Sequence, residues 1–261
     1  MKVRVISGIA MLPLVALIII GGYPLLAACF LIGLIGVKEL FNGFKAMDIN
    51  PNYGVAVASL IALYTLHILF PFREEYLLAW LVASVMASCI SIFRIDKHKV
   101  EDALATILGI VYVEFFSFHV AMVDGIDHHR ILIYLIFISA FGSDICAYFT
   151  GFAIGKHKLC PHLSPKKTIE GAVGGVVGAA LLCLLFAGIF APKYMLHSFI
   201  IGVIGAILSQ CGDLTASAFK RKMGIKDYGN LIPGHGGIMD RFDSILFTAP
   251  VVYHYITLVL V

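Results

Sequence analysis

The stretch Ser217–Asp243, SAFKRKMGIKDYGNLIPGHGGIMDRFD, separates two long apolar runs near the end of this 261-residue chain. It gathers lysines, arginines, glycines, one histidine and several aspartates. The chain as a whole is strongly apolar, since 60% of its residues are hydrophobic and only 13% are charged. A dense polar block between such runs is typical of a loop at a membrane surface, and its residue types suit phosphate and metal chemistry.

Nine apolar runs along the chain predict an all-α, polytopic integral membrane protein with about nine transmembrane helices. Each run is about 17 to 25 residues long, which is the length of helix that spans a bilayer. The mean hydropathy of +0.96 agrees with this class. The runs lie near residues 5–21, 24–41, 53–70, 77–93, 103–123, 131–155, 171–190, 195–217 and 238–258. Gly22 and Tyr23 separate the first two runs, which form either a tight hairpin or an element that does not fully cross.

Lysine and arginine are distributed unevenly between the two sides of this topology. With a cytoplasmic N-terminus, sixteen of the nineteen lie in inner segments or at inner helix ends, and only Arg73, Arg130 and Lys193 remain outside. Cytoplasmic loops of membrane proteins carry an excess of these residues. The bias predicts a multi-pass protein of the inner, cytoplasmic membrane, with loops 156–170 and 218–237 both in the cytoplasm.

The chain is expected to contain two regions and no separate soluble domain. Residues 1–100 would form N-terminal transmembrane helices. Residues 101–261 would form a transmembrane catalytic region, with the active site at the cytoplasmic side of the C-terminal helices. The expected surroundings are membrane lipid, and no nucleic acid is expected as a partner.

Three aspartates in the last two runs are candidate metal ligands. Asp240 and Asp243 are three residues apart, so on a helix they share a face, with β-carbons about 5–6 Å apart. Asp213 lies within the preceding run, where an unpaired carboxylate is costly and marks a candidate functional site. Oxygen ligands without Cys or His at metal spacing favour Mg²⁺ over zinc. The alternative is that these carboxylates only form ion pairs across helices, with Lys220, Arg221 or Arg241.

The polar block also carries candidate phosphate-binding groups. Lys220, Arg221, Lys222 and Lys226 follow the eighth run, although a charge cluster alone is more often a topology signal than a site. The segment 233–237 allows the backbone to approach a ligand and ends at the N-terminus of the last helix, where amide groups would face an anion. His235 can bind a phosphate or transfer a proton, or it can make only a structural contact.

A second polar loop precedes the seventh run. In LSPKKTIEG, Ser164 and Pro165 predict the cap and first position of a helix, with Lys166, Lys167 and Thr168 in its first turn. Cations at a helix N-terminus oppose the macrodipole, so a bound phosphate would offset them. The alternative is that these lysines only face the cytoplasm.

Other polar residues lie inside or at the ends of apolar runs. Asp144 is flanked by small residues in the sixth run and is a further candidate site residue, with pairing to a buried lysine as the alternative. Glu39, Glu114 and His119 are interpreted as interior packing or polar bridges.

The polar block resembles the C-terminal motif of the phosphatidate cytidylyltransferases, also called CDP-diacylglycerol synthases. The matching positions are Ser217, Phe219, Lys220, Arg221, Lys226, Asp227, Gly229, Ile232, Pro233, His235, Gly236, Gly237, Asp240, Arg241 and Asp243. A second stretch is similar to another shared region of the family, over Asp144, Ala147, Tyr148, Phe149, Gly151, Ser164, Pro165, Lys166, Lys167, Thr168, Glu170 and Gly171. It departs from the family at Ile169, where many members carry an aromatic residue. Together the two stretches cover the C-terminal half.

The resemblance implies transfer of the cytidylyl group from CTP to phosphatidic acid, giving CDP-diacylglycerol and pyrophosphate in phospholipid biosynthesis. It implies that Asp213, Asp240 and Asp243 hold Mg²⁺, with a second cation such as K⁺ between them, and that Asp144 lies near the nucleotide or metal. The groups assigned to substrate binding are Asp144, Ser164, Lys166, Lys167, Thr168, Lys220, Arg221, Asp227 and Arg241. Lys226 and His235 are counted as catalytic with the three aspartates. A homodimer is also implied.

The residues fit this chemistry independently, because both reactants are anionic and their repulsion must be neutralised by metal ions and fixed cations. Other functions stay open. The cytidylyl group could go to another lipid phosphate, such as one with ether-linked isoprenoid chains. A CTP-dependent lipid-alcohol kinase would also need magnesium and basic loops, but it should lack the whole polar block. A cation transporter would place aspartates within spans, but it needs neither the His-Gly-Gly loop nor lysine-rich segments facing one compartment.

Overall fold

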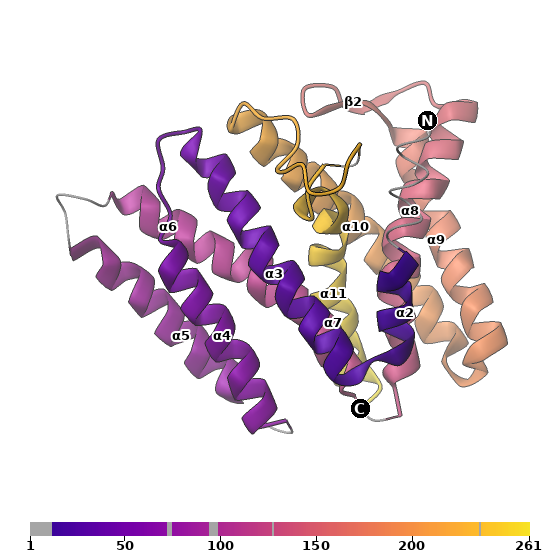
Figure 1. The fold of residues 1–261 in the computed structure, drawn as a ribbon. Helices are drawn as coiled ribbons and strands as arrows, with labels where there is room; N and C mark the ends of the chain where they lie inside the picture. The colour runs from indigo at the N-terminus through magenta and orange to yellow at the C-terminus, as the bar shows by residue number, and fades with distance from the viewer. Residues whose placement is uncertain (1–11, 72–74, 94–98, 127, 235) are drawn as a thin grey trace.

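The computed structural model describes residues 12–71, 75–93, 99–126, 128–234 and 236–261 (Figure 1). Nearly all of its regular structure is helical, as predicted. By length and composition, seven helices in this part of the chain can cross a membrane. They are Gly22–Lys45, Glu75–Phe93, Val100–Asp124, Arg130–Ile154, Ile169–Phe190, Pro192–Lys222 and Met239–Val259. These are the features of a multi-pass membrane protein.

The prediction of nine spans is not confirmed: among the described residues seven helices are long enough, and the third run gives a shorter helix. Helix α2 covers Leu12–Ile20, the described part of the first run. Helix α4, Tyr53–Leu69, has 17 residues. A helix of that length rises about 25 Å, which is less than the hydrocarbon core of about 30 Å.

The first two runs pack as a tight hairpin. Helix α3, Gly22–Lys45, follows α2 directly, since Gly21 and Gly22 have φ angles of 65° and 58° that turn the chain sharply. The amide of Gly22 donates a hydrogen bond of 2.6 Å to Asp124 Oδ2. Arg130 donates from Nη2 to the carbonyl of Ile19 at 3.0 Å and from Nε to Asp124 Oδ1 at 2.6 Å. The corner is thus held by the α7–α8 connection.

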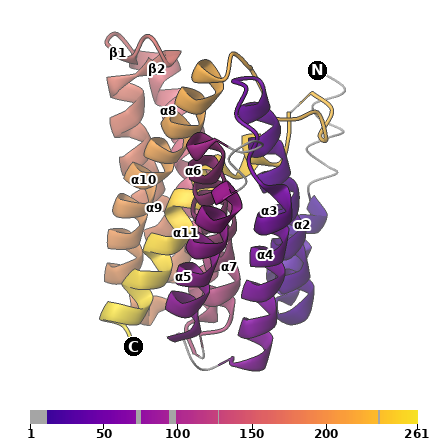
Figure 2. The ribbon, with the colours of Figure 1, turned by 90° about the vertical axis from the view of Figure 1, so that its left-hand side faces the viewer.

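The remaining helices follow the predicted runs. They are α5 (Glu75–Ile90) with the 3₁₀ turn η1 (Ser91–Phe93), α6 (Val100–Gly109), the π-helical segment η2 (Ile110–Phe115), α7 (Phe116–Asp124), η3 (Arg130–Leu132), α8 (Ile133–Ile154), α9 (Ile169–Phe190), η4 (Pro192–Tyr194), α10 (Met195–Lys222) and α11 (Met239–Val259). Helices α8, α9 and α10 form a close group, and α11 packs against α7, α8 and α10 (Figure 2). Small residues permit this approach: a β-carbon on Gly202 would lie 2.7 Å from the Cα of Ala180.

A two-stranded antiparallel sheet, β1 (Lys158–Cys160) with β2 (Ser164–Thr168), is the exception to the all-α prediction. The prediction that Ser164 and Pro165 begin a helix is wrong, because pairing of Lys158 with Thr168 keeps residues 164–168 extended. Helix α9 begins at Ile169. Its cap is Thr168, whose Oγ1 accepts a hydrogen bond of 3.1 Å from the amide of Gly171.

The β1–β2 hairpin and the 223–238 loop lie at the same end of the helix bundle, and the C-terminus lies at the other end (Figures 1 and 2). The two polar loops were predicted to share one side of the membrane. The arrangement brings residues from both halves of the C-terminal region into one site.

Candidate active site

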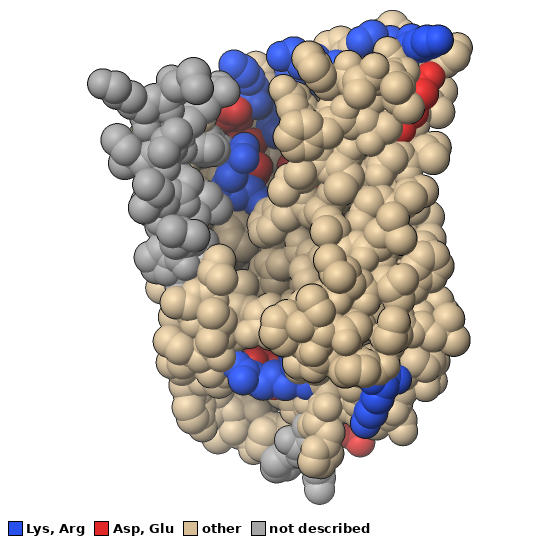
Figure 3. Space-filling model, turned by 90° about the vertical axis from the view of Figure 1, so that its right-hand side faces the viewer, with Lys and Arg blue, Asp and Glu red and all other residues tan. Residues whose placement is uncertain are grey.

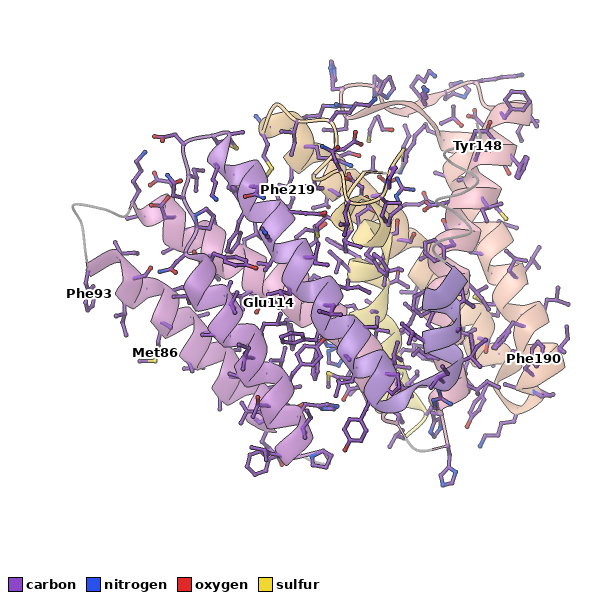
Figure 4. The ribbon with its side chains drawn as sticks, in the orientation of Figure 1. Met86, Phe93, Glu114, Tyr148, Phe190 and Phe219 are labelled. Carbon is purple, nitrogen blue, oxygen red and sulfur yellow. The ribbon has the colours of Figure 1, made fainter. Side chains whose placement is uncertain are left out.

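The first polar cavity lies among α8, α9, α10 and the β1–β2 hairpin, and we call it the hairpin cavity. Its volume is about 560 Å³. The charged side chains on its wall are Asp144, Lys158, Lys166, Lys167 and Asp213. Tyr148, near the loop end of α8 in Figure 4, also lines it. The cavity therefore combines lysines, carboxylates and an aromatic wall.

Three carboxylates from three helices form what we call the acid cluster: Asp144 on α8, Asp213 on α10 and Asp243 on α11. Asp243 interacts electrostatically with both of the others, and Asp144 interacts with Asp213. Helices α10 and α11 approach closely here, since a β-carbon on Gly212 would lie 2.6 Å from the carbonyl oxygen of Asp243. Positive charge reaches the cluster from Lys167, Lys220 and Arg241. Like charges that interact with one another favour a bound cation.

Asp213 is paired with the hairpin. Lys167 Nζ donates to Asp213 Oδ2, and Ser217 Oγ lies 3.5 Å from Oδ1. The side chains of Lys167 and Asp213 are 28% and 27% exposed, so solvent and small ions can reach the pair. The ammonium group of Lys167 thus occupies the Asp213 oxygen to which another cation could bind.

Asp243 is buried, with 8% of the residue exposed. Its Oδ1 accepts a hydrogen bond of 2.8 Å from the amide of Ser244. Within the described part of the chain, Oδ2 has no hydrogen-bond partner. A largely buried carboxylate with an oxygen free of hydrogen bonds is suited to bind a cation or a hydrogen-bond donor.

Asp240 has no such spare capacity. Its Oδ1 accepts from Lys220 Nζ at 2.8 Å, and its Oδ2 accepts from the amides of Tyr228 at 2.8 Å and Gly237 at 3.0 Å. The side chains of Lys220 and Asp240 are 14% and 2% exposed. Asp240 and Asp243 share the first two turns of α11, but their carboxylates have different partners. For Asp240 the geometry favours the ion-pair alternative.

The second polar cavity is lined by residues of the 223–238 loop and by Arg241 of α11, and we call it the loop cavity. Its volume is about 690 Å³, and Lys226, Asp227 and Arg241 contribute its charged side chains. The Nε atom of Arg241 is buried and has no hydrogen-bond partner among the described residues. An unpaired guanidinium nitrogen is suited to an oxyanion. His235 lies outside the described residues.

The loop is packed onto α10 through Tyr228. Its hydroxyl donates a hydrogen bond of 3.1 Å to the carbonyl of Ala216, and Lys220 Nζ lies 5.4 Å from the centre of its ring. Burial, reinforced by the charges of Asp240 and Asp243, raises the pKa of the Tyr228 phenol. The phenol therefore stays protonated and keeps its role as a donor.

Sequence reasoning missed the part played by Glu39, which it interpreted as packing or a polar bridge. Glu39 Oε1 accepts from the amide of Ile238 at 3.1 Å, and Oε2 accepts from the amide of Met239 at 2.9 Å. These amides at the N-terminus of α11 were predicted to face an anion, and that anion is a side chain of α3. The available signal was a carboxylate near the end of an apolar run.

Two predicted site residues lie outside the polar cavities, and the hydroxyl of a third is already hydrogen-bonded. Thr168 lines the hairpin cavity, but its hydroxyl caps α9. Arg221 is exposed in the last turn of α10, and Ser164 is partly exposed in β2. Neither Arg221 nor Ser164 lines one of the two polar cavities.

An apolar cavity of about 140 Å³ lies on another side of α11. Its lining includes Ala28 and Cys29 of α3 and Phe242 of α11. Three consecutive residues of α11 therefore face different environments. Arg241 lines the loop cavity, Phe242 lines the apolar cavity, and Asp243 belongs to the acid cluster. Figure 3 shows one face of the molecule hollowed below charged residues, with mostly uncharged residues beside the hollow.

The acid cluster fits Mg²⁺ as an ion shared with a substrate. Among the described residues, no three Asp, Glu, His or Cys side chains are arranged as a ready-made metal site. Mg²⁺ usually keeps several waters and is held by one or two carboxylates together with substrate phosphates. Asp213 and Asp243 fit this requirement, while the oxygens of Asp240 are already bound to Lys220 and to the amides of Tyr228 and Gly237.

The fold and the site define a multi-pass helical membrane protein in which two cation-lined cavities flank a cluster of carboxylates. Residues 2–259 match the model of the Cytidylyltransferase family, and the chain belongs to this family of nucleotidyltransferases. A phosphatidate cytidylyltransferase of Staphylococcus haemolyticus is 33% identical over 257 residues, which cover 96% of each chain. Those of Staphylococcus epidermidis and Staphylococcus aureus are also 33% identical, over 263 and 258 residues and 96% of each chain. The family assignment made from the polar block is confirmed.

Proposed function

We propose that the protein transfers the cytidylyl group of CTP to phosphatidic acid and releases CDP-diacylglycerol and pyrophosphate. In this reaction a phosphate oxygen of the lipid forms a bond to the α-phosphorus of CTP, and the bond from that phosphorus to the pyrophosphate oxygen breaks. The observation that carries the proposal is the acid cluster, which lies beside two cavities that both present cations. The names of the relatives support the choice of substrates.

The hairpin cavity suits the nucleotide. Lys158, Lys166 and Lys167 can neutralise a triphosphate, and such charge-assisted bonds are the strong ones. The rings of Tyr148 and Phe152 are nearly parallel, with centroids 6.4 Å apart and an angle of 15° between them, and they offer an exposed face on which a base can stack. The hairpin cavity therefore offers lysines for the triphosphate of CTP and aromatic rings for its base.

The loop cavity suits the lipid phosphate, with Arg241 and Lys226 as its cations. Phe242, the residue after Arg241, lines the apolar cavity, so a lipid with its phosphate at Arg241 would place part of an acyl chain there. A cavity of about 150 Å³ accepts a molecule the size of benzene, so this one holds a segment of a chain. The rest of the tails would stay in the bilayer.

Asp213 and Asp243 are the residues that would hold Mg²⁺, with Asp144 nearby, and a second cation such as K⁺ would share the acid cluster. When bound, Mg²⁺ neutralises phosphate charge and orients the reacting groups. Lys167 is then free to leave Asp213 for a phosphate oxygen. Asp240 and Lys220 hold the loop, and His235 stays a candidate for phosphate binding or proton transfer.

The topology belongs to the same proposal. Nine spans with a cytoplasmic N-terminus would place the hairpin and the 223–238 loop at the cytoplasmic side of the inner membrane, where CTP is available. Residues 1–100 would supply N-terminal helices and residues 101–261 the catalytic region. We also propose a homodimer, on the basis of the family.

Turnover by the purified protein in detergent tests the function. We expect labelled CTP and phosphatidic acid to give CDP-diacylglycerol with Mg²⁺, and we expect EDTA to abolish the product and added Mg²⁺ to restore it. A phosphate lipid with ether-linked isoprenoid chains serves as the competing acceptor. Turnover of that lipid alone, or cation flux in liposomes without turnover, would contradict the proposal.

A further inference from the structure

We propose that Glu39, in the second apolar run and outside the C-terminal motif, is a positioning residue for the transfer reaction. Its carboxylate would hold the 223–238 loop and the first turn of α11 in the geometry that the acid cluster and the loop cavity require. The inference rests on the proposed function for its catalytic consequence, but its structural part can be tested without turnover.

The contact is specific and spans nearly the whole chain. The Glu39 carboxylate is buried, with 7% of the residue exposed, and its two oxygens accept from the amides of Ile238 and Met239, 199 and 200 residues away. The first amides of a helix have no partners within it, and a carboxylate there is favoured by the helix dipole. Glu39 therefore caps α11 from another helix.

Two glycines of the loop are matched to this carboxylate. A β-carbon on Gly229 or Gly237 would fall on the Glu39 carboxyl group. Neither glycine has a positive φ, so the backbone conformation admits other residues at both positions. The space taken by Glu39 is thus the reason why these positions exclude a side chain.

Asp240 holds the same loop from α11. It accepts from the amides of Tyr228 and Gly237, so the two carboxylates bind neighbouring loop segments. Lys226 and Arg241 line the loop cavity, and Asp243 follows within the next turn of α11. Release of Glu39 would therefore shift the lipid-phosphate side of the site, while the hairpin cavity is built from other elements.

Gly229→Ala tests this arrangement in two backgrounds. In the wild type the new methyl group displaces the Glu39 carboxylate, so kcat should fall about tenfold, as expected when buried amides lose their acceptor. The KM for CTP should change by less than about twofold. General destabilisation does not predict a fall in kcat with an unchanged KM. In the Glu39→Ala background the methyl group has space, so Gly229→Ala should add less than about twofold.

Gly224→Ala is the matched control. Gly224 lies in the same loop with φ +68° and no atoms near its missing side chain, so alanine there strains the backbone without touching Glu39. Its effect should be equal in both backgrounds.

Tryptic cleavage of residues 220–230 in the folded protein supplies the second measurement. Glu39→Ala and Gly229→Ala should each speed cleavage, and the double variant should be no faster than Glu39→Ala alone. Equal effects of Gly229→Ala in both backgrounds, in turnover and in cleavage, would overturn the proposal. A wild type without turnover would overturn the proposed reaction, while the cleavage rates still decide whether Glu39 holds the loop.

Discussion

The acid cluster and the two carboxylates beneath the 223–238 loop differ in how far their oxygens are satisfied. Glu39 and Asp240 bind amides and an ammonium through all four of their carboxylate oxygens. Asp243 has one oxygen bound to a neighbouring amide, and Asp213 is paired with a partly exposed lysine. The buried, hydrogen-bonded carboxylates of Glu39 and Asp240 fix the fold. Asp243, which has an unbonded oxygen, and Asp213, whose ion pair is partly exposed, are available to a metal ion or substrate.

This difference predicts opposite effects of the same chemical change. In the acid cluster, replacing a carboxylate by an amide removes like-charge repulsion, so the folded state should keep its stability while catalysis is lost. Beneath the loop, the same replacement leaves buried donors without an acceptor, so stability should fall first.

The largest expected effect is the loss of turnover in Asp213→Asn and Asp243→Asn. Each variant replaces a negatively charged oxygen that would hold Mg²⁺ in the transition state by a neutral amide. We therefore expect initial rates to fall about a thousandfold. The unfolding temperature in detergent should not decrease. Asp48→Asn is the control, because Asp48 is an exposed carboxylate outside the acid cluster. It is paired with Lys99, which holds the pKa of the Asp48 carboxyl below its usual value. Normal turnover by both acid-cluster variants would remove them from the site.

Asp240→Asn should act mainly on stability. It leaves the ammonium of Lys220 unpaired in a site where that side chain is 14% exposed, and breaking such a pair costs about 3 kcal/mol. Thermal unfolding, followed with a thiol-reactive dye, should show a lower midpoint than in Asp243→Asn. If Asp240→Asn instead has wild-type stability and no activity, Asp240 is a metal ligand.

Lys167→Ala has the smallest expected effect, on nucleotide binding. Loss of one charge-assisted phosphate contact should raise the KM for CTP about tenfold and change the KM for phosphatidic acid little. Lys193→Ala is the control, since that lysine packs on Tyr194 at the start of the connection to α10. An equal rise in both KM values would show that Lys167 does not distinguish the two cavities.

The sequence predicted the membrane class and the positions of the long helices, because run length and apolarity act locally. It also predicted Asp144 and Asp213 as unusual carboxylates, since both lie within apolar runs. It did not predict the β1–β2 hairpin: Ser164–Pro165 is a good local start signal for a helix, but cross-strand pairing and the Thr168 cap outweigh it.

The division of labour among the carboxylates could not be predicted either. Asp240 and Asp243 look equivalent by spacing, and only the folded loop brings the amides of Tyr228 and Gly237 to one of them. The role of Glu39 depends on a contact across 199 residues, which no local pattern encodes.

Anomalous scattering from Mn²⁺ in crystals grown with a non-hydrolysable CTP analogue is the most direct test of the central claim. The account predicts one strong peak within coordination distance of Asp213 and Asp243, beside the nucleotide phosphates, and none on Asp240. A peak on Asp240, or nucleotide bound in the hairpin cavity with no metal at Asp213 and Asp243, would contradict it.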